Sequence, residues 1–163
     1  MQWAGKDYLL EELYLSVNGL TTLPDLSPFG HLRTLHVNNN KLEKITKAMG
    51  LQRLAHLQHL NLRGNRITEI EPGALPCSLV SFSLSGSPLR HLPLPFSPQM
   101  QTLCLMATLI ESDEALLSIL QQAPQLVDLS LKYMDHISPL TDIFIARIKT
   151  CCPQLRRIDD LRV

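Results

Sequence analysis

One spacing of apolar residues recurs along this chain and constrains its fold more than any other feature. Residues 10–20, 32–42 and 57–67 each have an aliphatic residue at the first, fourth, sixth and eleventh positions and asparagine at the ninth. A unit of this size cannot bury its own apolar side, so internal repetition predicts a stack of similar units that share one core.

Three later copies keep the apolar positions but lose the asparagine. They start at Leu79, Met100 and Leu126, and a partial unit starts at Leu155. The ninth position then holds, in order, Ser87, Thr108 and Met134. A carboxamide can both donate to and accept from the backbone of a turn, whereas a hydroxyl does so only in part and a thioether hardly at all. We therefore expect the C-terminal turns to differ from the N-terminal turns.

The pattern resembles that of leucine-rich-repeat proteins, over nearly the whole chain. The resemblance implies an α/β fold: a solenoid of about six repeats with a parallel β-sheet on its concave side. The residues that follow each strand would form the convex side. They predict loops in the N-terminal half and helices in the C-terminal half.

The convex segments carry their own local signals. Prolines at positions 93, 95 and 98 exclude a helix in the fourth repeat. In the fifth repeat Ser112 is a candidate N-cap for a helix through Gln122. In the sixth, Ser138 is the expected N-cap and Pro139 the first helical residue of a helix that runs to about Thr150.

The sequence predicts one repeat domain over residues 10–163. Residues 1–9 form only a partial N-terminal stub, which favours a shortened form of a longer array. The end of the chain, about 139–163, resembles the cap that closes many intracellular leucine-rich-repeat domains. Pro153, Leu155, Ile158 and Asp159 match that cap, whereas Asp160 stands where glycine is common.

Composition narrows the function classes. Lysine plus arginine and aspartate plus glutamate both total 15, and 33 residues are leucine. Zero net charge argues against a dedicated nucleic-acid binder or a polybasic membrane-surface protein. No apolar run is long enough to span a bilayer. The four cysteines form no CxxC and no asparagine lies in a glycosylation sequon, which favours an intracellular location, cytoplasmic or nuclear.

Side chains that alternate with the inward leucines are expected on the concave face. In the first three repeats they include the residue types that are enriched at protein interfaces. We predict that a protein partner binds there, and the candidate residues are Glu12, Tyr14, Thr34, His36, Asn38, His59, Asn61 and Arg63.

These features favour a non-catalytic, monomeric protein-interaction module, such as a scaffold, adaptor or regulatory subunit. No nucleotide-binding loop, nucleophile elbow or metalloprotease motif occurs. The sequence therefore predicts no catalysis, no cofactor and no small-molecule substrate. His36 and His59 without a third ligand make a poor metal site, so none is predicted. The alternative is a nucleic-acid-associated repeat domain, as in mRNA-processing or export factors. Residues 118–126 resemble the helix-then-cap ending of that kind of protein.

Overall fold

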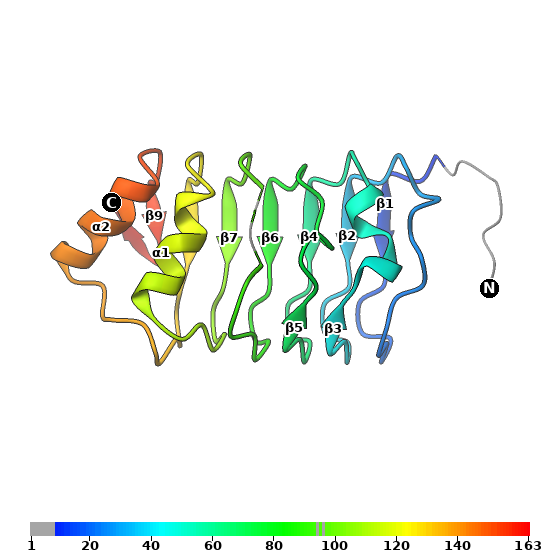
Figure 1. Ribbon diagram of the computed structural model, residues 1–163, viewed down its shortest axis with the longest axis horizontal. Helices are drawn as coiled ribbons and strands as arrows, with labels where there is room; N and C mark the ends of the chain where they lie inside the picture. The colour runs from blue at the N-terminus through cyan, green and yellow to red at the C-terminus, as the bar shows by residue number, and fades with distance from the viewer. Residues whose placement is uncertain (1–8, 94, 96) are drawn as a thin grey trace.

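The chain folds into a single row of stacked repeats. The computed structural model describes residues 9–93, 95 and 97–163, so the sequence-predicted stub of residues 1–9 lies outside the described residues except for Leu9. The repeat strands run side by side from one end of the molecule to the other (Figure 1). They are β1 (Glu12–Tyr14), β2 (Thr34–His36), β4 (His59–Asn61), β6 (Ser81–Ser83), β7 (Thr102–Cys104) and β8 (Asp128–Ser130).

These six strands are parallel, and two short strands complete the sheet. β9 (Arg157–Ile158) pairs parallel with β8, and β10 (Leu161–Arg162) pairs antiparallel with β9. The central residue of each strand faces its counterpart in the next repeat: Leu13 faces Leu35, and Leu35 faces Leu60. The predicted repeat register is thus the register of the sheet.

The leucines of the repeat pattern form one continuous core. Leu35, Leu62 and Leu103 have no exposed surface, and neither does Phe82, which takes a leucine position in the fourth repeat. Leu13 is only partly buried, since β1 has a partner strand on one side alone in the part of the chain that the structure describes. Burial is therefore complete only where a repeat has a neighbour on both sides.

Asn40 and Asn65 are buried and tie each repeat to the one before it. Asn65 Nδ2 donates to the carbonyl oxygens of Leu62 and Val37 at 2.8 and 3.0 Å, and Asn65 Oδ1 accepts from the Leu42 N–H at 3.1 Å. Asn18 also bonds the backbone of its turn, since it donates to the carbonyl oxygen of Ser16, but its side chain is exposed and forms no such tie. Within the described chain, Asn18 has no preceding repeat to reach.

The later turns differ from the N-terminal ones, as their residues predict. Thr108 Oγ1 donates only to its own repeat, at the Leu105 carbonyl oxygen, and the buried Ser87 Oγ has no hydrogen-bond partner. Where Met134 stands, Asp159 of the next unit accepts the backbone N–H groups of Leu131 and Lys132.

A second, smaller sheet lies beyond the strand ends of repeats two and three. β3 (Lys44–Ile45) pairs parallel with β5 (Glu69–Ile70). Two 3₁₀ turns, η1 (Lys47–Met49) and η2 (Leu51–Arg53), follow β3 and meet at Gly50, whose φ is 72°. The sequence did not reveal these elements, because two- and three-residue segments carry no measurable periodicity.

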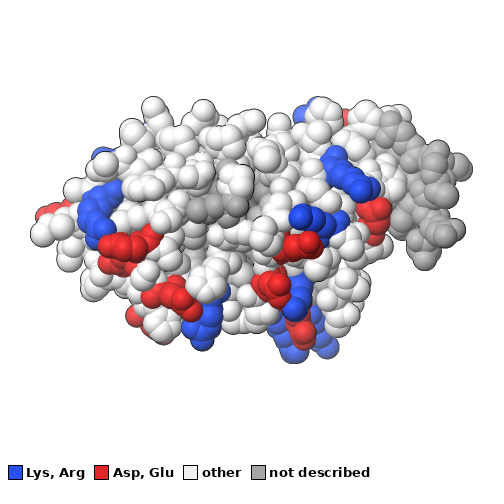
Figure 2. Space-filling view, in the orientation of Figure 1, with Lys and Arg blue, Asp and Glu red and all other residues white. Residues whose placement is uncertain are grey.

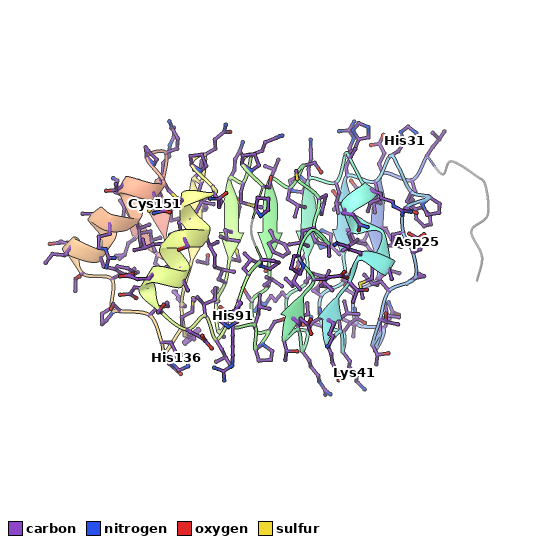
Figure 3. The ribbon with its side chains drawn as sticks, in the orientation of Figure 1. Asp25, His31, Lys41, His91, His136 and Cys151 are labelled. Atoms are coloured by element: carbon purple, nitrogen blue, oxygen red, sulfur yellow. The ribbon has the colours of Figure 1, made fainter. Side chains whose placement is uncertain are left out.

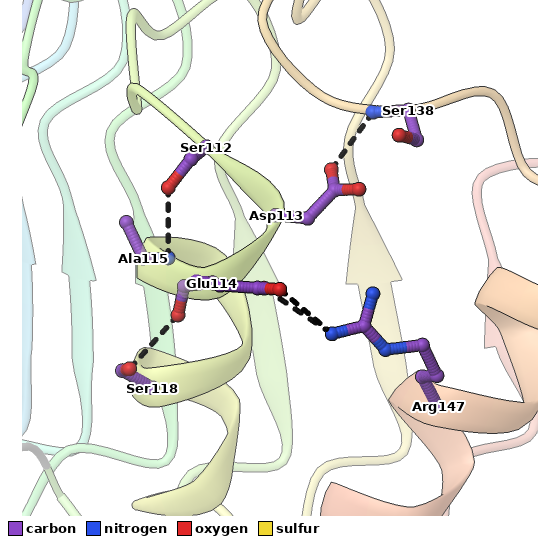
Figure 4. Close-up of polar contacts among 7 residues, drawn as sticks. All are labelled: Ser112, Asp113, Glu114, Ala115, Ser118, Ser138 and Arg147. Carbon is purple, nitrogen blue, oxygen red and sulfur yellow. Dashed lines mark hydrogen bonds and ion pairs between the residues drawn. The ribbon is translucent and has the colours of Figure 1, made fainter.

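The C-terminal half has helical backs. α1 (Asp113–Gln121) begins at the predicted cap Ser112, whose Oγ accepts the Ala115 N–H, and it lies beside α2 (Asp142–Cys151) (Figures 1 and 4).

The predicted start of the second helix is wrong. Thr141 caps α2 by accepting the Phe144 N–H, while the Thr141 N–H donates to the Pro139 carbonyl oxygen. The Ser138 N–H donates to Asp113 at 2.8 Å, so a turn tied to α1 replaces the first helical turn (Figure 4).

Candidate functional site

The sheet face opposite the helices carries all eight predicted site residues. We call this the open face and define it by the outward side chains of β1, β2, β4, β6, β7 and β8 and the residues that continue those strands. The register of the sheet places Glu12, Thr34 and His59 in one row and Tyr14, His36 and Asn61 in the next. Neighbouring strands lie about 4.8 Å apart, so each row brings together side chains that are more than 20 residues apart in sequence.

Tyr14 and His36 form an aromatic pair at the N-terminal end of the open face. Their rings stack with centroids 4.9 Å apart and an interplanar angle of 20°. The Tyr14 hydroxyl donates to Glu12 Oε2 at 2.8 Å, and this bond to a carboxylate raises the pKa of the tyrosine. Tyr14 nevertheless remains 61% exposed, which leaves a large aromatic surface ready for contact.

A third row consists of Ser16, Asn38 and Arg63, two residues further along each repeat, and hydrogen bonds position its members. The Ser16 hydroxyl donates to Asn38 Oδ1 at 2.6 Å, and Asn61 Oδ1 accepts the backbone N–H of Arg63 at 3.1 Å. Among the described residues Arg63 has no ion-pair partner, and its side chain is exposed. The first three repeats therefore present a stacked aromatic pair flanked by an unpaired guanidinium.

The open face changes character towards the C-terminus. Its middle consists of small uncharged side chains: Ser81, Ser83, Thr102 and Cys104. Charges return at the end, where two of the cations are paired. Arg157 Nε donates to Asp128 Oδ1 at 2.8 Å, and Lys132 pairs with Asp160.

The helical side carries paired charges as well. On the face seen in Figure 2, lysine and arginine side chains lie next to aspartate and glutamate side chains. Arg147 on α2 donates to both carboxylate oxygens of Glu114 on α1, at 3.0 and 3.2 Å (Figure 4). Neutralised charges of this kind give a surface little electrostatic attraction for a partner.

The chemistry-bearing residues do not assemble into a reactive centre in the part of the chain that the structure describes. No group of three histidines, cysteines or carboxylates there is placed to hold a metal ion. Asp159 is engaged by backbone N–H groups and Asp160 by Lys132, so these adjacent carboxylates are structural. Cys152 is buried and donates its thiol to the carbonyl oxygens of Leu120 and Ala123.

Sequence reasoning missed two features at the ends of the strands. His31 and His56 stack with ring centroids 6.5 Å apart at the edge where the strands begin, and Figure 3 places His31 there. At the opposite edge, a groove follows the turns after β1, β2, β4 and β6. Both features join positions outside the alternating pattern, so strand periodicity does not reveal them.

Together, the parallel sheet, its leucine core and the ordered side chains of the open face define a leucine-rich-repeat solenoid. The family model for leucine-rich repeats matches residues 8–67 and 30–89, just over half of the sequence, and the chain belongs to this family. Leucine-rich-repeat proteins generally mediate protein–protein interaction.

Curated relatives match about half of this chain. Human lumican is 29% identical over 84 residues, which are 52% of this chain and 25% of lumican. Rabbit lumican is 27% identical over 84 residues, 43% of that sequence. The chain thus spans well under two thirds of either relative.

Among solved structures, a leucine-rich-repeat protein of Leptospira interrogans superposes with a TM-score of 0.62 at 24% identity. The alignment covers 92% of this chain and 43% of that protein, and it supports the fold. No helix among the described residues is long and apolar enough to cross a membrane.

Proposed function

We propose that this protein is a non-catalytic interaction module that binds a protein partner on the N-terminal half of its open face. The observation that carries the proposal is the stacked pair of Tyr14 and His36, with Tyr14 61% exposed. Aromatic side chains and arginine supply much of the energy at protein interfaces, and here they lie together on a rigid sheet.

The arrangement also suits binding energetically. Tyr14 is held by its ring contact and by its bond to Glu12, so little side-chain entropy is lost when a partner covers it. Asn38 and Asn61 are similarly held by Ser16 and by the Arg63 backbone. A preorganised polar surface around an aromatic centre is typical of a specific, hydrated interface.

An intracellular location is part of the proposal. It is supported by the four cysteines, Cys77, Cys104, Cys151 and Cys152, which are all free thiols. Adjacent Cys151 and Cys152 form no disulfide, although Cys151 is only partly buried. Free thiols are typical of proteins in a reducing compartment.

Site-specific photo-crosslinking tests the partner-binding surface. A photoreactive phenylalanine analogue is placed at Tyr14 in one variant and at Ile143, an exposed residue of α2, in another. We expect a discrete crosslinked protein from cells at position 14 and none at position 143. Equal crosslinking at both positions, or none at position 14, would contradict the proposal.

A matched pair of triple variants gives the second test. Tyr14→Ala/His36→Ala/Arg63→Ala removes the aromatic centre and the free guanidinium. Tyr133→Ala/His136→Ala/Arg90→Ala removes the same three residue types from exposed positions off the open face. The first variant should lose the partner that the parent captures, and the second should retain it.

A second candidate, nucleic-acid binding, is favoured by one observation. Arg156, Arg157 and Arg162 surround a hollow of about 410 Å³ at the C-terminal end of the sheet. One of these cations is already paired with Asp128. RNA affinity measured against salt concentration decides this candidate: phosphate neutralisation gives a steep salt dependence.

A further inference from the structure

The groove at the strand ends is lined in part by glycines. It has a volume of about 500 Å³ and runs along the turns of the first four repeats. Gly19, Gly64 and Gly86 line it, with φ of 68°, 68° and 76°. A Cβ at Gly86 would meet only the backbone of Gly64, at 3.7 Å, and one at Gly19 would meet nothing within 4 Å. At Gly64, which lies between them, a Cβ would be only 2.3 Å from Asn39 Oδ1, so a bound chain can approach the backbone closely at Gly19 and Gly86 but meets the Asn39 side chain at Gly64.

Two cations stand side by side along the groove. Lys41 and Arg66 follow Asn40 and Asn65, so they occupy equivalent positions in adjacent repeats. Both line the groove and both are exposed. The equivalent positions on either side are Gly19 and Pro88, so the positive charge is confined to repeats two and three. Lys41 lies at the lower edge in Figure 3, opposite His31.

These two cations lack the partners that their neighbours have. Lys44 pairs with Glu69 at 2.6 Å, and Lys47 pairs with Glu71 at 3.8 Å. In the described part of the chain neither Lys41 nor Arg66 forms an ion pair or a side-chain hydrogen bond. None of the described residues that line the groove is a carboxylate; Glu43, two residues after Lys41, lies outside the lining.

The distance between the two cations suits an anionic ligand in an extended conformation. Adjacent repeats are about 4.8 Å apart, and alternate side chains of an extended peptide are about 6.6 Å apart on one side of its backbone. Long lysine and arginine side chains can span that difference. Two carboxylates separated by one residue can thus contact Lys41 and Arg66 together while the peptide backbone lies along the groove.

We propose that this groove binds an extended segment of the protein partner with acidic residues at alternate positions, which pair with Lys41 and Arg66. The proposal rests on the proposed function and extends it from the open face around the strand ends. Arg63, on the open face, is separated from Arg66 only by the turn residues Gly64 and Asn65, so one partner can contact both surfaces.

Fluorescence anisotropy tests the groove with a defined probe. The probe is a labelled ten-residue peptide of alternating glutamate and threonine, and glutamine replaces glutamate in the control peptide. The test variant is Lys41→Gln/Arg66→Gln. The matched control, Arg53→Gln/Lys149→Gln, removes two exposed cations outside the groove lining. Thermal unfolding of both variants confirms that they are folded.

We expect the groove variant to bind the glutamate peptide about tenfold more weakly than the parent, and the matched control within about twofold of it. Equal affinity of parent and groove variant overturns the proposal, as does equal affinity for the two peptides. Tighter binding of a ten-nucleotide oligothymidylate than of the glutamate peptide also overturns it, in favour of nucleic acid.

The crosslinking result at Tyr14 separates the two proposals. If position 14 still crosslinks a partner but Lys41→Gln/Arg66→Gln binds the glutamate peptide as tightly as the parent does, only the groove assignment fails. If Tyr14→Ala/His36→Ala leaves peptide affinity unchanged but no partner crosslinks at position 14, the open-face assignment fails and the groove remains.

Discussion

The side chain of Asn40 completes the turn of the repeat that precedes it: its Nδ2 donates to the carbonyl oxygen of Leu15 at 2.9 Å. Its Oδ1 accepts the backbone N–H groups of Asn18 and Leu20, both at 3.0 Å. The first turn is thus stabilised by a residue of the second repeat. Neighbouring repeats are joined by polar contacts in the core as well as by apolar packing.

Asn65→Ala should destabilise the protein much more than Asn18→Ala. The first change removes three hydrogen bonds and leaves the buried Leu42 N–H and Leu62 carbonyl oxygen without partners, while the Val37 carbonyl oxygen still accepts from Asn40 Nδ2. We expect a loss of about 3 kcal/mol in the free energy of unfolding, against less than about 0.5 kcal/mol for the exposed Asn18. Urea denaturation measures both, and similar losses would refute the assigned roles.

Gly50→Ala should cost more than Gly19→Ala although both glycines have positive φ. A Cβ at position 50 would lie 2.1 Å from Asp25 Oδ1 and 2.8 Å from the Ser27 backbone nitrogen, whereas one at position 19 meets nothing within 4 Å. The left-handed conformation alone costs about 1 kcal/mol, and the clash with backbone should raise the cost at position 50 to about 3 kcal/mol. Thermal melting distinguishes them: equal melting temperatures would mean that the turn at Gly50 relaxes freely.

Leu62→Ala tests the core register. Leu62 has no exposed surface, so its truncation should cost roughly 2–5 kcal/mol. Leu9 is 78% exposed, and Leu9→Ala should change stability by less than about 0.5 kcal/mol. Chemical denaturation of both variants is the measurement, and a Leu62→Ala protein as stable as the parent would contradict the packing described here.

Val17→Asn should stabilise the fold. Val17 has a φ of 60°, which a β-branched residue adopts only with strain, whereas asparagine tolerates this region. We expect a gain of about 1 kcal/mol in the free energy of unfolding. Tyr133→Asn, at a φ of 61° in the sixth repeat, is the parallel change. A loss of stability in both variants would show that contacts of the native side chains outweigh the backbone strain.

Cys152 should resist alkylation in the folded protein. Burial raises the pKa of its thiol to about 12, so the reactive thiolate is absent at pH 8. Cys77 is exposed and serves as the internal control. Mass spectrometry after iodoacetamide treatment at pH 8 should show modification of Cys77, and modification of Cys152 only when urea is present.

The same pKa shift has a consequence for stability. The pKa of the Cys152 thiol in the folded protein lies above its value of roughly 8.5 in the unfolded chain. The thiol's contribution to the free energy of unfolding is therefore fully present below about pH 8.5. It is lost progressively as the pH rises from there towards about 12. The unfolding midpoint of the parent should therefore fall more steeply in this window than that of Cys152→Ala, and parallel curves would contradict the shift.

The sequence predicted the structural features that recur in every repeat and missed those that depend on a contact at one place in the fold. Strand positions followed from the alternation around residues such as Leu13, Leu35 and Leu60, and the Ser112 cap followed from its own side chain. The start of α2 was misplaced because Ser138 and Thr141 are both good caps. A tertiary contact, the bond from the Ser138 N–H to Asp113, decided between them.

The site was predictable to the same extent. Alternation placed Tyr14 and His36 on one face, but their stacking depends on the parallel register between repeats. The groove near Lys41 and Arg66 depends on a left-handed residue at one position of each repeat: Val17, Asn39, Gly64, Gly86, Ala107 and Tyr133. Because only two of these six are glycine, residue type gave no signal for the shared conformation.

The two kinds of convex segment have a consequence for the curvature of the molecule. β3 and β5 pair as neighbouring strands, and strands in a sheet lie about 4.8 Å apart on either side of the core. Packed helices such as α1 and α2 need about 8–10 Å. Around repeats two and three the concave sheet and the convex segments therefore have the same spacing per repeat. Over the last repeats the convex helices are spaced more widely than the strands of the concave sheet. Bending of the solenoid is expected to concentrate at its C-terminal end, which leaves Tyr14 and His36 on its straighter part.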